Sequence, residues 1–292
     1  MTAREPARRT RMSTILWIAG AGVAMYAAWC LLLFLNQSSQ VYVPDRIVSA
    51  TPADIGLAFE DLRIDTPDGE TLSAWYVPAG EEPNGLTVFL CHGNGGDMGD
   101  RIDSIANFHR MGFNVMLFEY RGYGTSTGRP TEEGTYLDAK VCWEHMIRTR
   151  NIDPNSVVLV GRSLGGAVAA HLALRVDPLL LVIEWAFTSV PDLGAELYPF
   201  LPVRLLCRFR YATVAHVARV RCPVLVTHSR QDSTIPFQHG ERIFAAAPEP
   251  KRFLGLAGPH AQEGVDSCAR SRKALSEFLG AIRTTERRVR TR

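Results

Sequence analysis

Ser163 is the centre of the pentapeptide Gly161–Gly165, which matches the pattern G-x-S-x-G. The apolar run Val157–Val160 leads into it, and the alanine-rich stretch Leu164–Val176 leads out. A serine between a strand and a helix stands on a sharp turn, and flanking glycines relieve the crowding there. The pattern therefore predicts that the Ser163 hydroxyl is a nucleophile for acyl transfer. The alternative is a glycine-rich turn with a serine that does no chemistry.

A serine hydroxyl is a poor nucleophile unless a histidine takes its proton and an acid orients that histidine. After a strand-turn-helix nucleophile, the acid and then the histidine follow along the chain, each after a later strand. Asp232 follows the apolar run Pro223–Thr227, and His260 follows the apolar run Phe253–Leu256. We therefore expect Asp232 to be the acid and His260 the base.

Other residues fit these two roles less well. Glu184, at the end of the strand predicted after Ser163, is the best alternative acid. Asp266 comes after the predicted base and is expected to begin a helix. The weaker candidates for the base are His228, which precedes the acid at a strand end, His239, which lies inside a predicted helix, and His171, which points away from Ser163 on the same helix.

The tetrahedral intermediate of acyl transfer carries an oxyanion, which needs fixed N–H donors. One donor is expected from the amide of Leu164, directly after the nucleophile, and the other from a loop after an early strand. The stretch His92–Gly96 reads H-G-N-G-G after the run Leu86–Cys91 and supplies such a loop. We expect the backbone N–H of Asn94 to be the second donor. His92 is expected to be structural, because it precedes the nucleophile and the triad is already filled.

The same glycine-rich loop does not fit a nucleotide. A dinucleotide fingerprint that begins at Gly93 would need glycine where Met98 stands, and no Lys-Ser or Lys-Thr follows to make a P-loop. The sequence contains no H-E-x-x-H and no set of metal ligands. The formal net charge is only +2, so the composition does not point to nucleic acid. We therefore expect no cofactor, no metal and no nucleic-acid partner.

The segment Thr14–Leu35 predicts a membrane anchor. Its 22 residues carry no charge. At about 1.5 Å per residue they span roughly 33 Å, enough for a bilayer core of about 30 Å. A buried core helix would need a polar face, which this segment lacks. A cleaved signal peptide usually has a shorter apolar region of about 7–15 residues, so we expect a retained transmembrane helix.

The charges around the anchor predict its orientation. Residues 36–44 after it carry no charge, whereas the acid Glu5 is outnumbered before it by Arg4, Arg8, Arg9 and Arg11. The positive-inside rule then places the N-terminus in the cytoplasm and the rest of the chain on the periplasmic or extracytoplasmic side. The basic residues of 284–292 are too far from the anchor to change this. They are interpreted as a solvated tail.

Residues 41–283 predict a single domain in which strands and helices alternate. Phe59–Asp65 and Thr71–Val77 are period-two runs around the turn Pro67-Asp68-Gly69, which indicates an antiparallel hairpin. Short apolar runs with the length of buried parallel strands then alternate with helix-like stretches. This pattern predicts an α/β fold, a mostly parallel twisted sheet with helices on both faces. The expected strands are Leu86–Cys91, Asn114–Glu119, Val157–Val160, Leu179–Ile183 and Pro223–Thr227, and the expected helices are Thr135–Arg148, Leu164–Val176, Phe237–Ala247 and Cys268–Ile282.

Two features leave alternatives open. The segment Ser189–Ala218 interrupts the alternation and mixes aromatic residues, prolines and arginines. It is either a small lid over the active site or a helix followed by a loop. The six cysteines have no C-x-x-C pair and no histidine at zinc spacing, so they are expected to be buried and apolar. A disulfide between Cys207 and Cys222 would need an oxidising compartment.

Four motifs together resemble the Bem46-like branch of the α/β-hydrolases, which includes membrane-attached acyl-thioester hydrolases. They are His92-Gly93-Asn94, Tyr120-Arg121-Gly122-Tyr123-Gly124, Gly161–Gly166 and Asp232-Ser233-Thr234-Ile235-Pro236, and Thr51–Leu57 and Asp68-Gly69 resemble that branch's entry to the domain. The resemblance covers roughly residues 41–280. It implies a triad of Ser163, Asp232 and His260 with oxyanion amides from Asn94 and Leu164, and structural roles for Arg121 and Tyr123. Two positions depart from the branch: Glu119 stands where aspartate is common, and Pro259-His260-Ala261 where Gly-His-Asn is common.

The sequence therefore predicts a membrane-anchored serine hydrolase that cleaves an ester or thioester through an acyl-enzyme. The expected substrate is a small or lipid-like acyl compound. A serine aminopeptidase-like amide hydrolase is the second hypothesis, because it would use the same triad. A tethered binding protein on a catalytically dead fold is the third, and the complete set of Ser163, Asp232 and His260 argues against it.

Overall fold

The computed structural model describes the backbone of residues 5–290 and the side chains of residues 12–284. Eight strands form one sheet, and their bounds match most of the predicted runs within a few residues. They are β2 (Glu60–Asp65), β3 (Thr71–Val77), β4 (Thr87–Cys91), β6 (Asn114–Phe118), β7 (Val157–Arg162), β8 (Leu180–Glu184), β9 (Val224–Ser229) and β10 (Lys251–Leu256).

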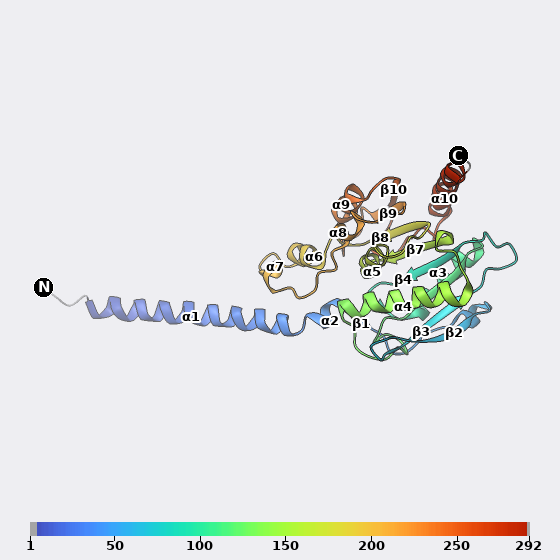
Figure 1. The fold of residues 1–292 in the computed structure, drawn as a ribbon. Coiled ribbons are helices and arrows are strands. Elements are labelled where there is room, and N and C mark those ends of the chain that lie inside the picture. Colours follow the sequence, from blue (N-terminus) through green and yellow to red (C-terminus); the bar gives the residue numbers. More distant parts are fainter. Residues whose placement is uncertain (1–4, 291–292) are drawn as a thin grey trace.

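The strand order across the sheet is β10-β9-β8-β7-β4-β6-β3-β2 (Figure 1). The pairs β2–β3 and β3–β6 are antiparallel, and all other neighbouring strands are parallel. The predicted hairpin and the mostly parallel α/β sheet are therefore confirmed. Because parallel strands end at one edge, the residues after β4, β7, β8, β9 and β10 meet at the same side of the molecule.

Helices cover both faces of the sheet because each central strand is apolar on both sides. In β4, Phe89 and Cys91 belong to one core cluster, while Val88 and Leu90 belong to the other. The first cluster is closed by α4 (Glu132–Arg150), α5 (Leu164–Leu172), α8 (Thr213–Val217) and α9 (Phe237–Ala246), and the second by α3 (Ile102–Arg110) and α10 (Ala269–Arg290).

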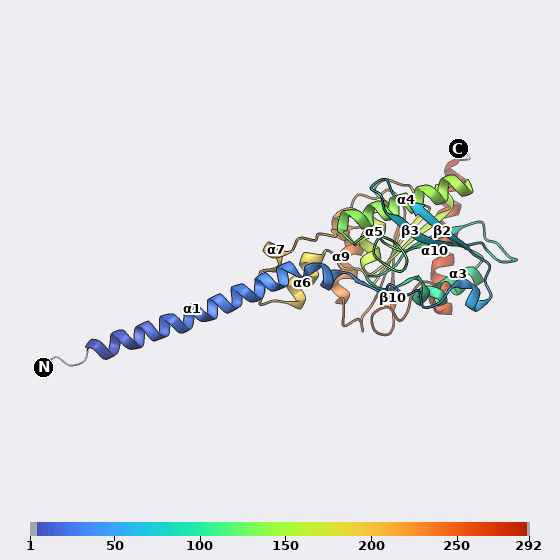
Figure 2. The ribbon, with the colours of Figure 1, turned by 90° about the horizontal axis from the view of Figure 1, so that it is seen from below.

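The N-terminal helix α1 (Glu5–Leu35) projects away from this domain (Figure 2). Within the described part of the chain, its segment Met12–Leu35 is long and apolar enough to cross a bilayer, and almost none of it is buried. This segment agrees with the predicted anchor at 14–35. The arginines that predicted its orientation, Arg4, Arg8, Arg9 and Arg11, lie outside the described side chains.

Some elements differ from the sequence-based expectations. The helix after Ser163 ends at Leu172 rather than at residue 176, and α3 was not predicted. The last helix continues through Arg290, so residues 284–290 continue α10 instead of forming a separate tail. Residues 291 and 292 lie outside the described residues. All six cysteines are free thiols, so the Cys207–Cys222 disulfide is not formed.

The segment 189–218 folds into three short helices, α6 (Val190–Leu197), α7 (Val203–Leu206) and α8. We call residues 189–218 the insertion. Its last helix, α8, packs on α5 and α9, whereas α6 and α7 lie beside the C-terminal turns of α1 (Figure 1). The insertion is therefore attached both to the sheet domain and to the N-terminal helix.

Candidate active site

Ser163 occupies a strained turn between β7 and α5. Its φ and ψ are +52° and −116°, a conformation that a residue with a side chain rarely adopts. Two hydrogen bonds hold this turn: the Ser163 N–H donates to the Glu184 carbonyl (2.8 Å), and the Gly166 N–H donates to the Ser163 carbonyl (3.0 Å). The strand-turn-helix geometry expected of a nucleophile elbow is thus present at this serine.

The glycines around Ser163 are required by close backbone packing. A Cβ on Gly165 would overlap the carbonyl oxygens of Cys91 and His92, and a Cβ on Gly161 would overlap the Gly165 carbonyl. The G-x-S-x-G pattern therefore reflects the contact of the elbow with the end of β4 and the loop after it. This contact places Ser163 next to the predicted oxyanion loop.

We expect Gly165→Ala to destabilise the fold by about 3 kcal/mol or more, because backbone atoms of β4 cannot move aside cheaply. The matched control is Gly255→Ala, since a Cβ at Gly255 meets nothing within 4 Å. Chemical denaturation of both variants in the same detergent measures the difference. Equal stability of the two variants would contradict this account of the elbow.

His260 and Asp232 form a short hydrogen bond. The His260 Nδ1 lies 2.7 Å from the Asp232 Oδ2. The other carboxylate oxygen, Oδ1, accepts the N–H groups of Thr234 (2.9 Å) and Ile235 (2.8 Å). Both oxygens of Asp232 are therefore fixed, and the imidazole ring is oriented with its Nε2 away from the acid.

The surroundings of Asp232 favour its charged form. Burial by itself would raise the pKa of Asp232, but the hydrogen bonds from His260 and from the Ile235 and Thr234 amides outweigh it and lower the pKa below 3.8. Asp232 is therefore a carboxylate at neutral pH. A carboxylate at Nδ1 keeps the proton there and leaves Nε2 free to accept one.

His228 also lies near Asp232, with 3.5 Å between its Nε2 and the Asp232 Oδ2. Its Nε2 is committed to the Ile235 carbonyl at 2.8 Å, so that nitrogen carries a proton. Burial lowers the pKa of His228 and keeps the ring neutral. His228 is fully buried. We therefore interpret it as a residue that packs against Asp232 and not as the base.

The oxyanion loop follows β4, as predicted. The Gly93 carbonyl lies 2.7 Å from His92 Nδ1. The C=O and N–H of a trans peptide point in opposite directions, so the Asn94 N–H is turned away from the buried His92 ring. Asn94 shares a cavity with Ser163, and Leu164, the first residue of α5, follows Ser163 directly along the chain.

Residues directly after the N-terminal helices hold this loop from outside. The strand β1 (Val43–Pro44), which follows α2 (Gln37–Val41), pairs parallel with β5 (Gly95–Gly96). The Val43 N–H and the Tyr123 hydroxyl both donate to the Asn94 carbonyl, at 3.0 and 2.8 Å. The side-chain Nδ2 of Asn94 in turn donates to the Val41 carbonyl at 3.1 Å. This tether is not predicted by the sequence, because so short a strand has no periodic signal.

The alternative acid Glu184 has a different partner. Its Oε2 accepts a hydrogen bond from Arg162 Nε at 2.6 Å, and its Oε1 accepts the Val265 N–H at 2.7 Å. Arg162 also pairs with Asp266. Burial would lower the pKa of Arg162, but the two carboxylates outweigh it and raise that pKa. Glu184 and Asp266 therefore form a buried ion-pair network under the elbow, and neither contacts His260 by any hydrogen bond in the described structure.

The side chains of the remaining rivals and structural residues have partners other than Ser163 and His260. His171 stacks on Tyr136, with 3.7 Å between ring centroids. His239 accepts the Thr188 N–H at 3.0 Å under the insertion. His92 is fully buried, and its Nε2 lies 3.3 Å from the Glu119 carboxylate. Glu119, which stands where aspartate is common in the branch, therefore contacts the His92 ring. Arg121 bridges Asp68 and Asp138 at 2.6 and 2.8 Å.

Ser163 and His260 open onto one cavity of about 770 Å³. Most of its wall is polar, from the oxyanion loop, from η2 (Met98–Arg101) and α3, and from residues 260–267. Charged and polar groups include Arg101, Arg110, Asn107, Ser104 and Gln262. The insertion contributes no residue to this wall in the described structure. Trp185 is a further wall residue, with its ring 6.2 Å from His260, that the sequence analysis did not single out.

Residues 82–188 match the family model described as serine aminopeptidase, S33. The chain is 36% identical over 237 residues to an uncharacterised protein of Mycobacterium tuberculosis, covering 81% of this chain and 84% of that protein. It is 31% identical over 251 residues to the α/β-hydrolase domain-containing protein WAV2 of Arabidopsis thaliana, covering 79% of each. The protein bem46 of Schizosaccharomyces pombe is 28% identical over 193 residues, covering 64% of each.

A solved structure with a similar fold is an esterase of Pyrococcus furiosus. Its TM-score is 0.67 at 19% identity, and the match covers 82% of this chain and 98% of the esterase. At this identity the likeness concerns the fold alone. Together with the relatives, it agrees with the α/β fold of the domain. The chain belongs to the α/β-hydrolase superfamily and, within it, to the Bem46-like branch.

Proposed function

We propose that this hydrolase is a membrane-anchored serine esterase or thioesterase with Ser163, His260 and Asp232 as its triad. The observation that carries the proposal is the 2.7 Å hydrogen bond between His260 Nδ1 and Asp232. This hydrogen bond orients His260, which lines the same cavity as Ser163. Ser163 itself stands on a strained turn. These are the parts that acyl transfer through serine needs.

In the first half-reaction, the Ser163 Oγ attacks the carbonyl carbon while its proton passes to His260 Nε2. The amides of Asn94 and Leu164 stabilise the oxyanion that forms. The C–O or C–S bond to the leaving group then breaks, and His260 returns its proton to that group. Water repeats the sequence on the acyl-enzyme and releases the acid, while Asp232 remains ionised and stabilises the imidazolium.

The polar cavity favours a substrate with polar groups near the scissile bond. Arg101 and Arg110 line it and can pair with an anionic group on the acyl or alcohol side. A purely apolar ester would displace water from this polar wall without offering its groups a hydrogen bond. An ester or thioester with a charged or hydroxylated leaving group is therefore the proposed substrate class.

A serine aminopeptidase activity is the second candidate, and the match to the serine aminopeptidase model supports it. Such an enzyme must bind the ammonium group of its substrate with a carboxylate. Asp103, which lines the cavity and is exposed, is the residue that would do so. A panel of aminoacyl amides beside a panel of esters distinguishes the two activities by kcat/KM.

We propose further that α1 is a retained anchor, with the N-terminus in the cytoplasm and the hydrolase domain on the extracytoplasmic side. The exposed apolar surface of Met12–Leu35 supports the anchor, since a core helix of a water-soluble domain would be buried. A reporter fused to the C-terminus tests the orientation. A reporter that is active only in the cytoplasm would refute it.

The test of the hydrolase proposal is labelling of the full-length protein in detergent by a fluorophosphonate probe. We expect one covalent adduct on Ser163, because only an activated serine reacts with this probe. Labelling should be lost in His260→Ala and retained in His171→Ala, a histidine on the other side of the elbow helix. A wild-type protein that stays unlabelled would support a catalytically dead binding protein.

A further inference from the structure

A charge-free stretch of the insertion runs beside the N-terminal helix. Residues 197–203 read LYPFLPV and join α6 to α7. Both ribbon views place these two helices beside the C-terminal turns of α1 (Figure 1, Figure 2). The Tyr26 hydroxyl donates a hydrogen bond of 2.7 Å to the Phe200 carbonyl. Tyr26 precedes the end of α1 by about 14 Å of helix, so the stretch reaches back along the proposed membrane span.

The side chains of this stretch, and that of Leu205 just after it, expose large apolar surfaces. The exposed fractions are 48% for Leu197, 47% for Tyr198, 83% for Phe200 and 83% for Leu205. Isolated exposed apolar residues are common, but a cluster on adjacent turns marks a surface that contacts something apolar. The nearest apolar phase is the bilayer that surrounds α1 in the proposed topology.

Most backbone N–H groups of the stretch are satisfied within the insertion. Lipid cannot satisfy free N–H and C=O groups, so a segment within it must satisfy them internally. Pro199 and Pro202 have no N–H to satisfy. The N–H groups of Tyr198, Leu201, Val203, Leu205, Leu206 and Cys207 all donate to carbonyls within residues 194–203. The hydroxyl of Tyr26 takes the Phe200 carbonyl, and the side chain of Gln37 donates to the Leu206 carbonyl at 2.8 Å.

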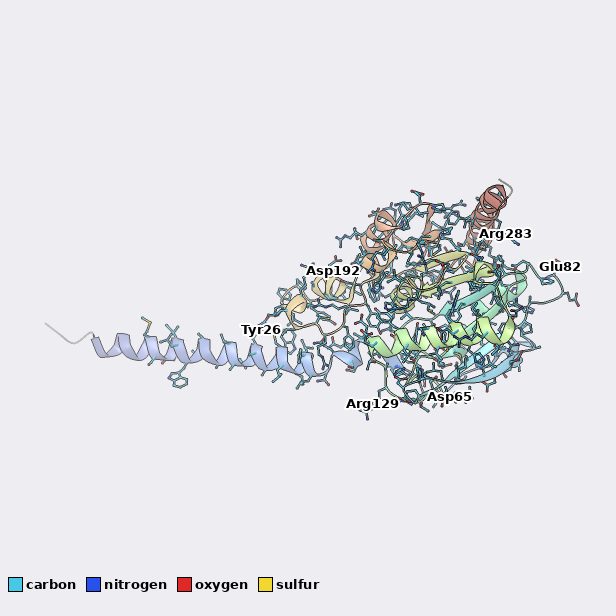
Figure 3. All side chains as sticks on the ribbon, in the orientation of Figure 1. Tyr26, Asp65, Glu82, Arg129, Asp192 and Arg283 are labelled. Carbon is cyan, nitrogen blue, oxygen red and sulfur yellow. The ribbon has the colours of Figure 1, made fainter. Side chains whose placement is uncertain are left out.

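The charged groups near the stretch are paired with one another or with α9. Glu196 pairs with Arg242 at 3.1 Å, and Arg204 pairs with Asp192 at 3.2 Å. In Figure 3, Tyr26 lies on α1 and Asp192 lies on α6, on the opposite side of the insertion. The Arg208 guanidinium lies 5.0 Å from the ring of Phe34 near the end of α1. This arrangement is typical of a segment with its charges at the membrane surface and its apolar tip below.

An apolar pocket of about 110 Å³ lies between α1 and the insertion. Cys30, Leu33 and Phe34 line it from α1, and Val190, Leu201 and Leu206 line it from the insertion. Its volume is comparable with the roughly 150 Å³ apolar cavity that stays dry and binds benzene. Apolar side chains make most of the wall, with Gln37 and Gln40 as its polar members, so the pocket suits a hydrocarbon chain. None of the described residues that line it also lines the cavity of Ser163.

We propose that the apolar side chains of residues 197–203 and of Leu205 enter the membrane leaflet nearest the hydrolase domain, with Arg204 at the membrane surface, and that the pocket binds one acyl chain of a bilayer phospholipid. The inference rests on the proposed anchoring of α1. The bound chain fills the space between the anchor and the insertion and so fixes the domain against the membrane surface. Because β1 follows the anchor directly and pairs with the oxyanion loop, this contact also fixes the position of the active site relative to the bilayer.

The test uses the full-length protein in vesicles of phosphatidylcholine that carries a diazirine on one acyl chain. After irradiation, lipid adducts are mapped to residues by mass spectrometry. We expect adducts on Phe200 and Leu205, on the pocket residue Val190, and on Trp17 within the anchor. Ile55, which is 42% exposed on the domain, is the internal control and should carry none.

Two variants fill the pocket from opposite walls, Cys30→Phe from α1 and Val203→Phe from α7. In each, the adduct on Val190 should fall by about tenfold, because a filled pocket leaves no apolar surface for the chain to bury. The adduct on Trp17 and the fluorophosphonate labelling of Ser163 should stay unchanged in both, which shows that the variants are folded and anchored.

Three outcomes would overturn the inference. Adducts on Trp17 without adducts on Phe200, Leu205 or Val190 would leave the anchor in the bilayer and the insertion outside it. An unchanged Val190 adduct in both variants would remove the acyl chain from the pocket. A protein with no adduct even on Trp17 would refute the anchor, and with it this inference, while Ser163 labelling would still report separately on the hydrolase.

Discussion

Ser163→Ala should lower kcat by roughly 10⁵–10⁶-fold and abolish fluorophosphonate labelling, because it removes the nucleophile of the proposed triad. The elbow that presents Ser163 is built from backbone contacts with Glu184 and Gly166, and these do not involve the hydroxyl. The alanine variant should therefore keep the wild-type fold. Hydrolysis of a soluble short-chain ester by purified full-length protein measures the loss.

A second substitution at the same position separates the chemistry from the strain. Ser163→Gly should be as inactive as Ser163→Ala, yet more stable by about 1 kcal/mol, since glycine adopts the positive φ of +52° without strain. Thermal unfolding of both variants in one detergent gives the comparison. If the glycine variant were less stable than the alanine variant, the turn would not be strained as described.

Asp232→Asn should lower kcat by about 10⁴-fold while leaving the fold intact. The side-chain carbonyl oxygen of the introduced asparagine can still accept the Thr234 and Ile235 amides that Oδ1 accepts now. Its NH2 group would then face His260 Nδ1 in place of Oδ2 and donate to it. The imidazole proton would move to Nε2, which could no longer accept the proton of Ser163. Steady-state hydrolysis of the same short-chain ester measures the loss.

The matched control is Glu184→Gln, which changes the alternative acid at a neighbouring strand end. Glu184 pairs with Arg162 and not with His260. Its loss should therefore lower the stability of the fold by about 3 kcal/mol and leave the proposed triad in place. Fluorophosphonate labelling of the folded fraction should persist in Glu184→Gln and fall sharply in Asp232→Asn. The reverse result would assign the acid to Glu184.

The sequence and the structure agree best where residues with possible catalytic roles lie within or directly after a locally encoded strand or helix. The strand-turn-helix around Ser163 was readable because apolar runs, glycines and alanines follow one another within some twenty residues. The order of Asp232 and His260 after that turn was sufficient to select them from several candidates. Both were chosen as residues that follow predicted strands, and parallel strands bring such positions to one edge.

The sequence favours Asp232 as the acid but keeps Glu184 as an alternative, since both follow strands of the same sheet. The structure separates them by direction. The Glu184 side chain turns under the elbow to Arg162, while Asp232 turns to His260. Such a choice depends on side-chain packing between β7, β8 and residues 264–266, and these segments are far apart along the chain.

By itself, the sequence determined the α/β class, the long apolar N-terminal segment, and the residues proposed to carry the chemistry, because these are encoded in local patterns and residue types. Only the tertiary structure decided that α6 and α7 lie against α1 and that β1 holds the oxyanion loop. Tyr26 and Phe200 are separated by 174 residues. Contacts at such a separation have no period or spacing in the sequence, and they exist only once the sheet has brought both segments together.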